Sequence, residues 1–544
     1  MNFKIPRHLL RTTATEPWQF DAVVIGSGVA GLMCAFKLSA HMKVALITKE
    51  RLVDSNSFYA QGGLAISMAN NDSPELWLKD TMLAGAGLSR ENAVKKIIDM
   101  TPQVIKDLET MGIRFDIDEE GRYLLGREAY HTVRRILHAG GDQTGKMISQ
   151  AMCTRIQDSS SAVIFEESFA IDILTDDSGS VCGITAIVDD CDAVFSTPNV
   201  VMATGGCGQA YFFTSNPQVA TGDGTVMAMR AGATLVDMEF MQFHPTICFA
   251  IPGQPFLVTE AVRGEGAKLV NSNGERFMPK YHEMAEIAPR DVVSKACYQE
   301  MKKTGSEWVY LDTTIFDTGF FSKRFPTVYN KCMKAGFDPT IQPIPVSPGA
   351  HYMMGGIEAD LECKTSLPGL YACGEAASNG MHGANRLASN SIPEGLVTGV
   401  VAANAILGSK RNQTQPVMPK PDLSKHDLPI TRTQLRLQNW ENIGIDRNGV
   451  DLEKHFNSIL PCLECGTKDS LGMLELANLY QISASITASA LTRTESRGAH
   501  YRTDIDSQNE DWSQKRVHLK SRVNGDSVEI ETGTHPKESW SWIK

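Results

Sequence analysis

Short apolar runs that end in glycine recur along this chain and set its main pattern. They are Asp21-Ala-Val-Val-Ile25 with its following glycine, Asn199-Val-Val-Met-Ala-Thr-Gly-Gly206 and Gly369-Leu-Tyr-Ala-Cys-Gly374. Continuous apolar runs of this kind are typical of parallel strands that are buried on both faces. Because the third run lies far along the chain from the first, the pattern predicts one nucleotide-binding domain that an insertion interrupts.

The first run begins a strand, a turn, a helix and a second strand. Apolar positions with helical spacing extend from Leu32 to His41, and Lys43-Val-Ala-Leu-Ile-Thr48 is a second apolar strand. A glycine-rich turn between a buried strand and a helix is the arrangement of a Rossmann-like domain. The predicted fold class is therefore α/β.

The rest of the pattern predicts two further domains. The insertion runs from about Met241 to about Ala350 and is rich in proline and glycine, as a lid would be, and a polar linker with three prolines, 409–421, marks a boundary. Helical spacing at 431–442 and 471–493 predicts a small helical domain, with a hairpin in the polar C-terminal end. The expected domains are 1–240 together with 351–408, then 241–350, and then 422–544.

Composition narrows the class of protein. The 544 residues are 42% hydrophobic and 21% charged, with a formal net charge of -11, which does not favour nucleic acid or an anionic membrane surface as a partner. The sequence has no apolar run of about 18 residues and no secretory signal at its start, so we expect a cytoplasmic protein. The 12 cysteines are scattered, as reduced thiols are, and the lone pair Cys462 and Cys465 is a weak signal for a metal or redox site. No metal is expected.

Three glycines after the first strand have the spacing of a dinucleotide-binding turn. Gly26 allows the tight turn, Gly28 lets the backbone approach a pyrophosphate, and Gly31 packs the helix against the strand. The N–H groups at the start of the helix then face the anion. The alternative is a purely structural glycine-rich turn.

The end of the second strand lacks the acidic residue that commonly binds a ribose. Thr48 and Lys49 stand there, and Glu50 follows. Lys49 is either a solvated surface charge or a contact to the adenosine half of a cofactor. The sequence leaves both alternatives open.

Further motifs make the resemblance specific. Asn56-Ser-Phe-Tyr-Ala-Gln-Gly-Gly63 follows the second strand, Gly374-Glu375 and Asn385-Arg-Leu-Ala-Ser-Asn-Ser-Ile392 lie near the end of the nucleotide-binding domain, and Glu495-Ser-Arg-Gly-Ala-His-Tyr-Arg-Thr-Asp504 lies near the C-terminus. The chain resembles the fumarate reductase/succinate dehydrogenase flavoprotein superfamily, and within it the L-aspartate oxidase family. This resemblance implies a Rossmann-like FAD-binding domain, an inserted α+β capping domain and a C-terminal helical domain.

The resemblance also implies which residues contact FAD. Small residues would allow the ring to approach, and carboxylates would accept hydroxyl protons of the cofactor. The alternative for Asp223, in Thr221-Gly-Asp-Gly224, is that it is only a turn residue. The implied FAD contacts are Gly26, Ser27, Gly28, Val29, Ala30, Gly31, Lys49, Asn56, Ser57, Phe58, Tyr59, Ala60, Gln61, Gly62, Gly63, Asp223, Glu375, Ser391 and Ile392.

Asn56 bears on how the flavin is attached. Dehydrogenase subunits of the superfamily link flavin covalently through a histidine just before the Ala-Gln-Gly-Gly stretch. Alignment on Ala60-Gln-Gly-Gly63 places Asn56 at that position. An amide has no nucleophilic ring nitrogen, so the resemblance predicts non-covalent FAD.

A dicarboxylate substrate needs cations and hydrogen-bond donors that replace the water around both of its carboxylates. The candidates are His244, Thr259, Arg290, His351 and Arg386. Taken singly, each has a structural alternative as a hydrogen-bonded core residue or an ion-pair partner. Their order along the chain matches the pattern of the superfamily.

The resemblance assigns proton transfer and amine recognition to a second group. Arg290 would be the proton donor or acceptor, with Glu260, Arg263 and Asp291 as candidates for a relay, although Glu260 alone fits a salt bridge equally well. In aspartate oxidases a glutamate at the position of Glu128 orients the substrate ammonium. Two glycines follow it in that family, whereas Ala129-Tyr130 follow it here.

The activity implied is the oxidation of L-aspartate to iminoaspartate, with a hydride passing from Cα to flavin N5 and with oxygen or fumarate as the electron acceptor. The product would feed quinolinate synthase in NAD biosynthesis, through at most a transient contact. One alternative is the flavoprotein subunit of a membrane succinate dehydrogenase or fumarate reductase, against which Asn56 and Glu128 argue. The other is a flavin-binding interaction protein without turnover.

Overall fold

The structure is a computed structural model, and it describes residues 1–9, 12, 14, 16–251, 254–416, 429–464 and 470–542. Within these ranges no helix combines the length and the apolar character needed to cross a membrane.

A parallel sheet forms the centre of the nucleotide-binding part. Its strand order is β20 (Leu370–Ala372), β12 (Val200–Met202), β3 (Ala22–Ile25), β4 (Val44–Ile47) and β8 (Ala162–Phe165). All neighbouring strands in it are parallel, and every residue of the first four is buried. The three glycine-ended runs of the sequence are therefore β3, β12 and β20, side by side, and the α/β prediction is confirmed.

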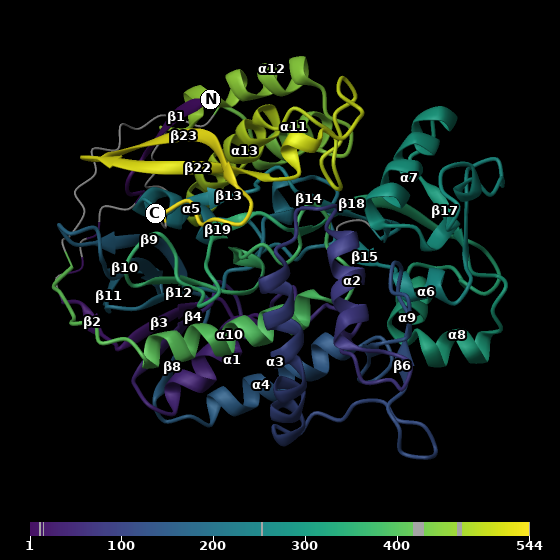
Figure 1. Cartoon of the computed structure of the whole chain (residues 1–544), viewed down its shortest axis with the longest axis horizontal. Helices are drawn as coiled ribbons and strands as arrows, with labels where there is room; N and C mark the ends of the chain where they lie inside the picture. Colours follow the sequence, from purple (N-terminus) through teal and green to yellow (C-terminus); the bar gives the residue numbers. More distant parts are fainter. Residues whose placement is uncertain are drawn as a thin grey trace.

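Helices cover this sheet. The helices α1 (Val29–Ser39) and α10 (Ser391–Leu407) pack closely together, α4 (Thr144–Gln157) packs against α1, and α3 (Glu91–Thr110) packs against α10 and α2 (Pro74–Ala84). Figure 1 shows α1, α3, α4 and α10 on one side of the molecule. A small sheet lies nearby, with β5 (Leu64–Ala65), β7 (Ile136–Leu137) and β6 (Leu125–Gly126).

Two further sheets extend the nucleotide-binding part. One has the order β2 (Trp18–Gln19), β11 (Cys191–Ser196), β10 (Val181–Val188) and β9 (Phe169–Thr175). The other has the order β1 (Asn2–Pro6), β23 (Ser527–Pro536), β22 (Lys515–Asn524), β13 (Leu235–Val236), β19 (Gly356–Glu358) and β21 (Ala377–Ser378). Helix α5 (Asp223–Ala231) contacts β9 and β22 and so connects both sheets.

The inserted segment forms an α+β cap, at the right of Figure 1 in teal. Its sheet has the order β15 (Phe256–Leu257), β14 (Met241–Cys248), β18 (Ile344–Met353), β17 (Val309–Asp312) and β16 (Lys268–Val270). Its helices are α6 (Glu260–Gly264), α7 (Arg290–Thr304), α8 (Thr318–Arg324) and α9 (Pro326–Lys334). The long strands β14 and β18 pair antiparallel, so the chain enters and leaves the cap at one place.

The C-terminal part is helical and then ends in a hairpin. Its helices are α11 (Arg432–Ile443), α12 (Gly449–Ile459) and α13 (Leu471–Thr492), of which the sequence predicted the first and third. The expected hairpin is formed by β22 and β23, and β22 also pairs with β13 of the nucleotide-binding part. Residues 417–421 of the predicted linker and 422–428 beyond it lie outside the described residues. The domain limits stay a proposal.

Short 3₁₀ helices complete the secondary structure. They are η1 (Gly208–Ala210), η2 (Met278–Lys280), η3 (Ala285–Ile287), η4 (Gly374–Ala376), η5 (Leu460–Cys462) and η6 (Glu510–Trp512). The fourth begins two residues after the end of β20, and the first begins six residues after the end of β12. Ligands bind at these strand ends in open α/β sheets.

Candidate active site

A cavity of about 840 Å³ opens at the carboxyl ends of the parallel strands. Its wall includes the glycine-rich turn after β3, the loop after β4, the segments after β12 and β20, and the first residues of α10. Of the predicted FAD contacts, the following line it: Gly26, Ser27, Gly28, Val29, Ala30, Lys49, Asn56, Ser57, Tyr59, Ala60, Gln61, Asp223, Glu375, Ser391 and Ile392. The cavity is continuous with two predicted substrate residues, His351 and Arg386.

The glycine-rich turn leaves no room for side chains at two of its positions. Gly26 has a φ of +108°, and a Cβ there would lie 2.2 Å from the carbonyl oxygen of Ala203. A Cβ on Gly31 would lie 1.9 Å from the carbonyl oxygen of Gly26, so Gly31 packs α1 against the turn. Gly28 is extended and precedes α1, whose N-terminus therefore opens onto the cavity. This is the geometry in which backbone N–H groups bind a pyrophosphate.

Lys49 and Asp223 meet at one end of the cavity. Lys49 Nζ lies 2.9 Å from Asp223 Oδ2 and also pairs with Glu475 of α13. Asn478, on the same helix, donates to Asp223 Oδ1 at 2.7 Å. Lys49 is thus a partly buried, ion-paired lysine in the cavity wall, and the C-terminal part of the chain helps to build this end of the site.

Glu375 lies on the opposite segment, after β20. Burial raises the pKa of its carboxyl to about 7, so this group can be protonated and donate a hydrogen bond near neutral pH. Met353 N–H donates to Glu375 Oε1 at 3.0 Å, and Asn56 Nδ2 lies 3.4 Å from Oε2. The wall therefore offers tight backbone, a helix N-terminus and hydroxyl-binding carboxyl groups, which fit the phosphates and hydroxyls of FAD. Phe58, Gly62 and Gly63 belong to the same loop as Asn56.

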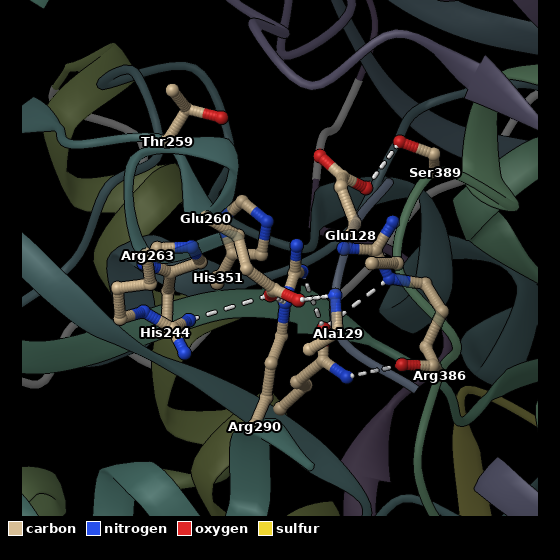
Figure 2. A network of polar contacts seen from close by, with 12 residues as sticks. Glu128, Ala129, His244, Thr259, Glu260, Arg263, Arg290, His351, Arg386 and Ser389 are labelled. Atoms are coloured by element: carbon tan, nitrogen blue, oxygen red, sulfur yellow. Dashed lines mark hydrogen bonds and ion pairs between the residues drawn. The ribbon is translucent and has the colours of Figure 1, made fainter. Parts of the chain in front are cut away.

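The predicted substrate residues come together where the cap meets the nucleotide-binding part, and Figure 2 shows them around the polar contacts of Glu260, Arg290 and Arg386. His244 lies on β14, His351 on β18, and Arg290 is the first residue of α7. Arg386 comes from the loop before α10 and lies 4.2 Å from the ring centroid of Tyr352. Thr259 precedes α6 as its N-cap and lies at the edge of the group.

His244 is buried, His351 lies partly exposed in the cavity wall, and both rings are neutral. Burial and the charge of Arg290 lower the pKa of both well below its usual value. Thr246 N–H donates to His244 Nδ1 at 3.2 Å, so the proton of His244 is on Nε2, a buried atom without a partner among the described residues. His351 Nδ1 lies 2.8 Å from Ser215 Oγ, and the two rings are 5.0 Å apart. An unpartnered buried N–H directed into the network suits a carboxylate ligand.

Arg290, Glu260 and Arg263 form a chain of charged groups. Arg290 Nε donates to Glu260 Oε2 at 2.5 Å, and Arg263 Nη2 lies 3.5 Å from the same oxygen. Glu260 Oε1 accepts the N–H of Ala129 at 2.6 Å. Asp291, the third relay candidate, instead accepts from Asn385 Nδ2 at 2.9 Å. The buried chain can share a proton among its members.

Glu128 lies in the same network, on the loop between β6 and β7. Ser389 Oγ donates to its Oε2 at 2.5 Å, whereas its Oε1 is buried without a partner among the described residues. Burial and then the charge of Glu260 raise its pKa to about 7. Tyr130, two residues on, has a φ of +68°, a value that favours glycine. The loop thus keeps a left-handed position where the family pattern has glycine, with a tyrosine in it.

Two residues of the network were not among the predicted ones. Gln242 Oε1 accepts from Arg290 Nη1 at 3.1 Å and from Arg386 Nε at 3.3 Å, so one amide oxygen orients both arginines. Ser389 holds Glu128 as described. Gln242 stands two residues before His244, and Ser389 lies within 385–392, so nearness in sequence to the candidate residues was the only available signal. Of the cysteine pair, Cys462 is buried and Cys465 lies outside the described residues.

Two models of known protein families match this chain. A model described as "FAD binding domain" matches residues 21–392, and one described as "Fumarate reductase flavoprotein C-term" matches residues 432–539. Together they cover the cap, the C-terminal helices and nearly all of the cavity wall.

Named relatives match over nearly the whole chain. L-aspartate oxidase of Streptomyces coelicolor is 41% identical over 537 residues, which cover 93% of this chain and 92% of that protein. L-aspartate oxidase 1 of Ralstonia nicotianae is 40% identical over 508 residues, which cover 89% of this chain and 95% of that protein. Among solved structures, an FrdA chain of E. coli quinol fumarate reductase superposes with a TM-score of 0.85 at 28% identity and covers 97% of this chain and 98% of that one.

Proposed function

Because the chain belongs to the L-aspartate oxidases, within the fumarate reductase/succinate dehydrogenase flavoproteins, we propose that it oxidises L-aspartate to iminoaspartate with oxygen or fumarate as the acceptor. The enzyme is a flavin-dependent oxidoreductase, and its cofactor is FAD. The observation that carries the proposal is Glu128, a buried carboxylate with one unpartnered oxygen in a network rich in arginine. A dicarboxylate without an amine brings only negative charge and has no cation to pair with such a group in its ionised form.

FAD would be held by the cavity wall. Gly26 to Ala30 with the N-terminus of α1 would bind its pyrophosphate, and Glu375 and the pair of Lys49 with Asp223 would bind its hydroxyl groups. When bound, FAD supplies the two-electron chemistry by accepting a hydride. The chain's own residues bind and orient the substrate and move its protons.

Charge supports an aminodicarboxylate as the substrate. The network has a net charge of one positive when both glutamates are ionised, because it contains three arginines, Arg263, Arg290 and Arg386, and two glutamates, Glu128 and Glu260. L-aspartate, with a net charge of one negative, balances it. Arg386, His351, His244 and Thr259 would hold the two carboxylates, because they offer cations and N–H or O–H donors. The free Oε1 of Glu128 would accept the ammonium. This fixes which face of Cα is presented, and alignment of this kind supplies much of the rate.

The fumarate half of the reaction needs a proton at carbon. Arg290 is the proposed donor, because it is joined at 2.5 Å to Glu260, and Glu260 to Arg263, through which the proton can be replaced. Oxidation of aspartate to the imine releases two electrons and two protons, and reduction of fumarate to succinate consumes the same number. The two reactions therefore balance without another reductant.

The first test compares three substrates under anaerobic conditions. We expect L-aspartate to bleach the flavin absorbance of the purified enzyme at least about 100-fold faster than succinate or D-aspartate, because only L-aspartate places an ammonium at Glu128 and its hydrogen in line. Stopped-flow absorbance measures the three rates on one preparation. Succinate bleaching as fast as L-aspartate would replace this proposal with a succinate dehydrogenase or fumarate reductase subunit, which the fold likeness to fumarate reductase favours.

The second test concerns attachment of the flavin. Asn56 stands in the cavity wall with its amide nitrogen 3.5 Å from Asn216 Oδ1, and an amide forms no bond to the flavin ring. We expect acid precipitation to leave all yellow colour in the supernatant and none on the protein, measured as absorbance of both fractions. Colour that stays with the pellet would contradict non-covalent binding.

The place of the reaction in metabolism is also proposed. The product is an imine that water hydrolyses, so an enzyme that consumes it must act quickly. We propose quinolinate synthase in NAD biosynthesis as that enzyme, with a transient contact at most, and the cytoplasm as the compartment, in line with the scattered cysteines of the sequence.

A further inference from the structure

The proposed reaction brings two occupants of different charge to one buried site. L-aspartate carries an ammonium and a net charge of one negative, whereas fumarate carries two negative charges and no cation. An ionised Glu128 suits the first occupant. With fumarate bound, the same ionised group would be a buried carboxylate beside another anion, which is strongly unfavourable.

The position of Glu128 leaves it free to face either occupant. The residue is 3% exposed, its Oε2 accepts from Ser389 Oγ, and its Oε1 has no partner among the described residues. A Cβ on Gly62 would lie 2.5 Å from Oε1, so the missing side chain at Gly62 makes room for this oxygen beside the cavity loop.

Ser389 is held firmly in place by its backbone. It has a φ of +57°, in the left-handed region that a serine seldom adopts. Its carbonyl accepts the N–H of Ala65 at 3.0 Å, and the carbonyl of Ala388 lies 3.0 Å from His131 Nε2. Both neighbours therefore fix the loop in a conformation that directs the hydroxyl at Glu128. In Figure 2 the dashed line from Ser389 ends on one carboxyl oxygen of Glu128, and no dashed line ends on the other oxygen.

The charges around Glu128 oppose one another. Burial and the negative charge of Glu260 on α6 raise its pKa, while Arg290 on α7, the hydroxyl of Ser389 and the charge of Arg386 lower it, and the balance is about 7. Both protonation states are thus within reach near neutral pH. The neighbouring His244 and His351 stay neutral in this range, because burial lowers the pKa of both well below its usual value.

We propose that Glu128 binds L-aspartate as a carboxylate and fumarate as a carboxylic acid, and that Ser389 is the positioning residue that serves both states. The inference rests on the proposed function, since it needs both occupants at this site. A serine hydroxyl donates to a carboxylate oxygen and also to the carbonyl oxygen of a carboxylic acid. Ser389 therefore holds Oε2 in the same place in both states, and the unpartnered Oε1 carries the proton that faces fumarate. The site changes its charge by one unit to match its occupant.

The proposal fixes the sign of two pH dependences. Fumarate binding takes up a proton on Glu128, so its affinity is full below the pKa of the free enzyme and falls about tenfold per pH unit above it. L-aspartate binding requires the ionised group, so its affinity falls as the pH drops below the same pKa. One residue would thereby give opposite slopes to the two substrates.

The test uses fumarate as a probe on the oxidised, FAD-loaded enzyme, which holds no electrons to reduce it. The dissociation constant is measured from the flavin absorbance change between about pH 5.5 and about pH 9, where fumarate keeps both charges. Wild type should show the slope above about pH 7. Glu128→Gln should bind fumarate with no slope and with the affinity that wild type has at low pH.

Two variants of Ser389 test its part. Ser389→Ala keeps the Cβ and Ser389→Gly favours the left-handed backbone, and both lack the hydroxyl that lowers the pKa of Glu128. Both should move the break in the fumarate curve to higher pH by the same amount, a shift that a loss of packing alone would not give. If neither variant moves the break, Ser389 is not the positioning residue.

Other outcomes separate the inference from the proposed function. A flat wild-type curve, or a slope that persists in Glu128→Gln, overturns the inference even if L-aspartate bleaches the flavin. Failure of L-aspartate to bleach the flavin overturns the proposed function, and with it the inference, which needs L-aspartate as one of the two occupants. Flavin absorbance and far-UV circular dichroism of each variant establish that it is folded and loaded, and Glu128→Gln decides alone if the Ser389 variants do not fold.

Discussion

Replacing Arg290 by leucine is expected to lower fumarate reduction about 10³-fold, in the range by which a positioned proton donor accelerates a reaction. The leucine has no proton to give to the substrate carbon. It also leaves Glu260 without its 2.5 Å partner, so the remaining chain to Arg263 ends short of the substrate. Arg290 comes from the cap and is not among the residues that line the cavity, so the variant should keep its cofactor.

Oxidation of L-aspartate should suffer far less in the same variant, by about tenfold. Forming the imine requires no proton transfer to carbon. The rate of aspartate oxidation therefore falls only because one cation near the substrate carboxylate is missing. The ratio of the two losses separates proton donation from binding. A variant that loses both reactions equally would make Arg290 a binding residue only.

The measurements compare steady-state fumarate reduction, driven by a reduced dye, with aspartate oxidation on one preparation. Arg290→Lys is the matched control, because it keeps the charge but not the planar geometry that joins Glu260 and Gln242. It should restore fumarate binding more than turnover. Fumarate reduction by Arg290→Leu within tenfold of wild type would remove Arg290 from the mechanism.

Local patterns predicted the fold because each strand of the central sheet has its own signature. The strands β3, β12 and β20 are buried on both faces, so each appears in the sequence as a continuous apolar run. A glycine follows each run where the chain turns toward the cavity. The helices α11 and α13 have helical spacing for the same local reason. The sheets built from short strands carry weaker signals, since two or three residues show no period. Helix α12 was not predicted, although its buried residues Leu452, His455, Phe456 and Ile459 have helical spacing.

Contacts between distant segments could not be predicted from such patterns. Glu128 meets Ser389 across 261 positions, and Lys49 meets Glu475 of the C-terminal helix. Periodicity describes which face of an element is buried and contains no information on which other element covers it. The left-handed backbone of Tyr130 was hidden for another reason, because a tyrosine gives no sign of a conformation that favours glycine.

The loop that carries Glu128 is anchored by an arginine, and this anchor gives the second large prediction. Arg135 Nη2 lies 2.9 Å from Asp72 Oδ1 and Nη1 lies 3.1 Å from Asp80 Oδ2, with all three side chains at most 2% exposed. Arg135→Met should lower the free energy of unfolding by about 3–5 kcal/mol, because it leaves two carboxylates buried without their cation. Thermal and urea unfolding of the FAD-loaded enzyme measure the loss.

The cost of Arg135→Met should depend on pH in a definite direction. Burial already raises the pKa of Asp72, and Arg135 opposes that rise, so the pKa climbs further in the variant. A carboxyl whose folded pKa lies above its unfolded pKa destabilises the protein above the folded pKa and ceases to do so as the pH falls through it. The gap between variant and wild type should therefore narrow toward acidic pH.

Two controls decide whether the buried charges are the cause. Arg122 pairs with Asp118 in the neighbouring hairpin with 73% of its side chain exposed, so Arg122→Met should cost less than about 1 kcal/mol. Adding Asp72→Asn and Asp80→Asn to Arg135→Met removes the uncompensated charges, and most of the lost stability should return because a buried ion pair contributes little beyond an uncharged set of similar volume. Two outcomes would contradict this explanation: equal losses for Arg135→Met and Arg122→Met, or no recovery of stability in the triple variant. Either would mean that packing of the long Arg135 side chain, and not its charge, holds the Glu128 loop in place.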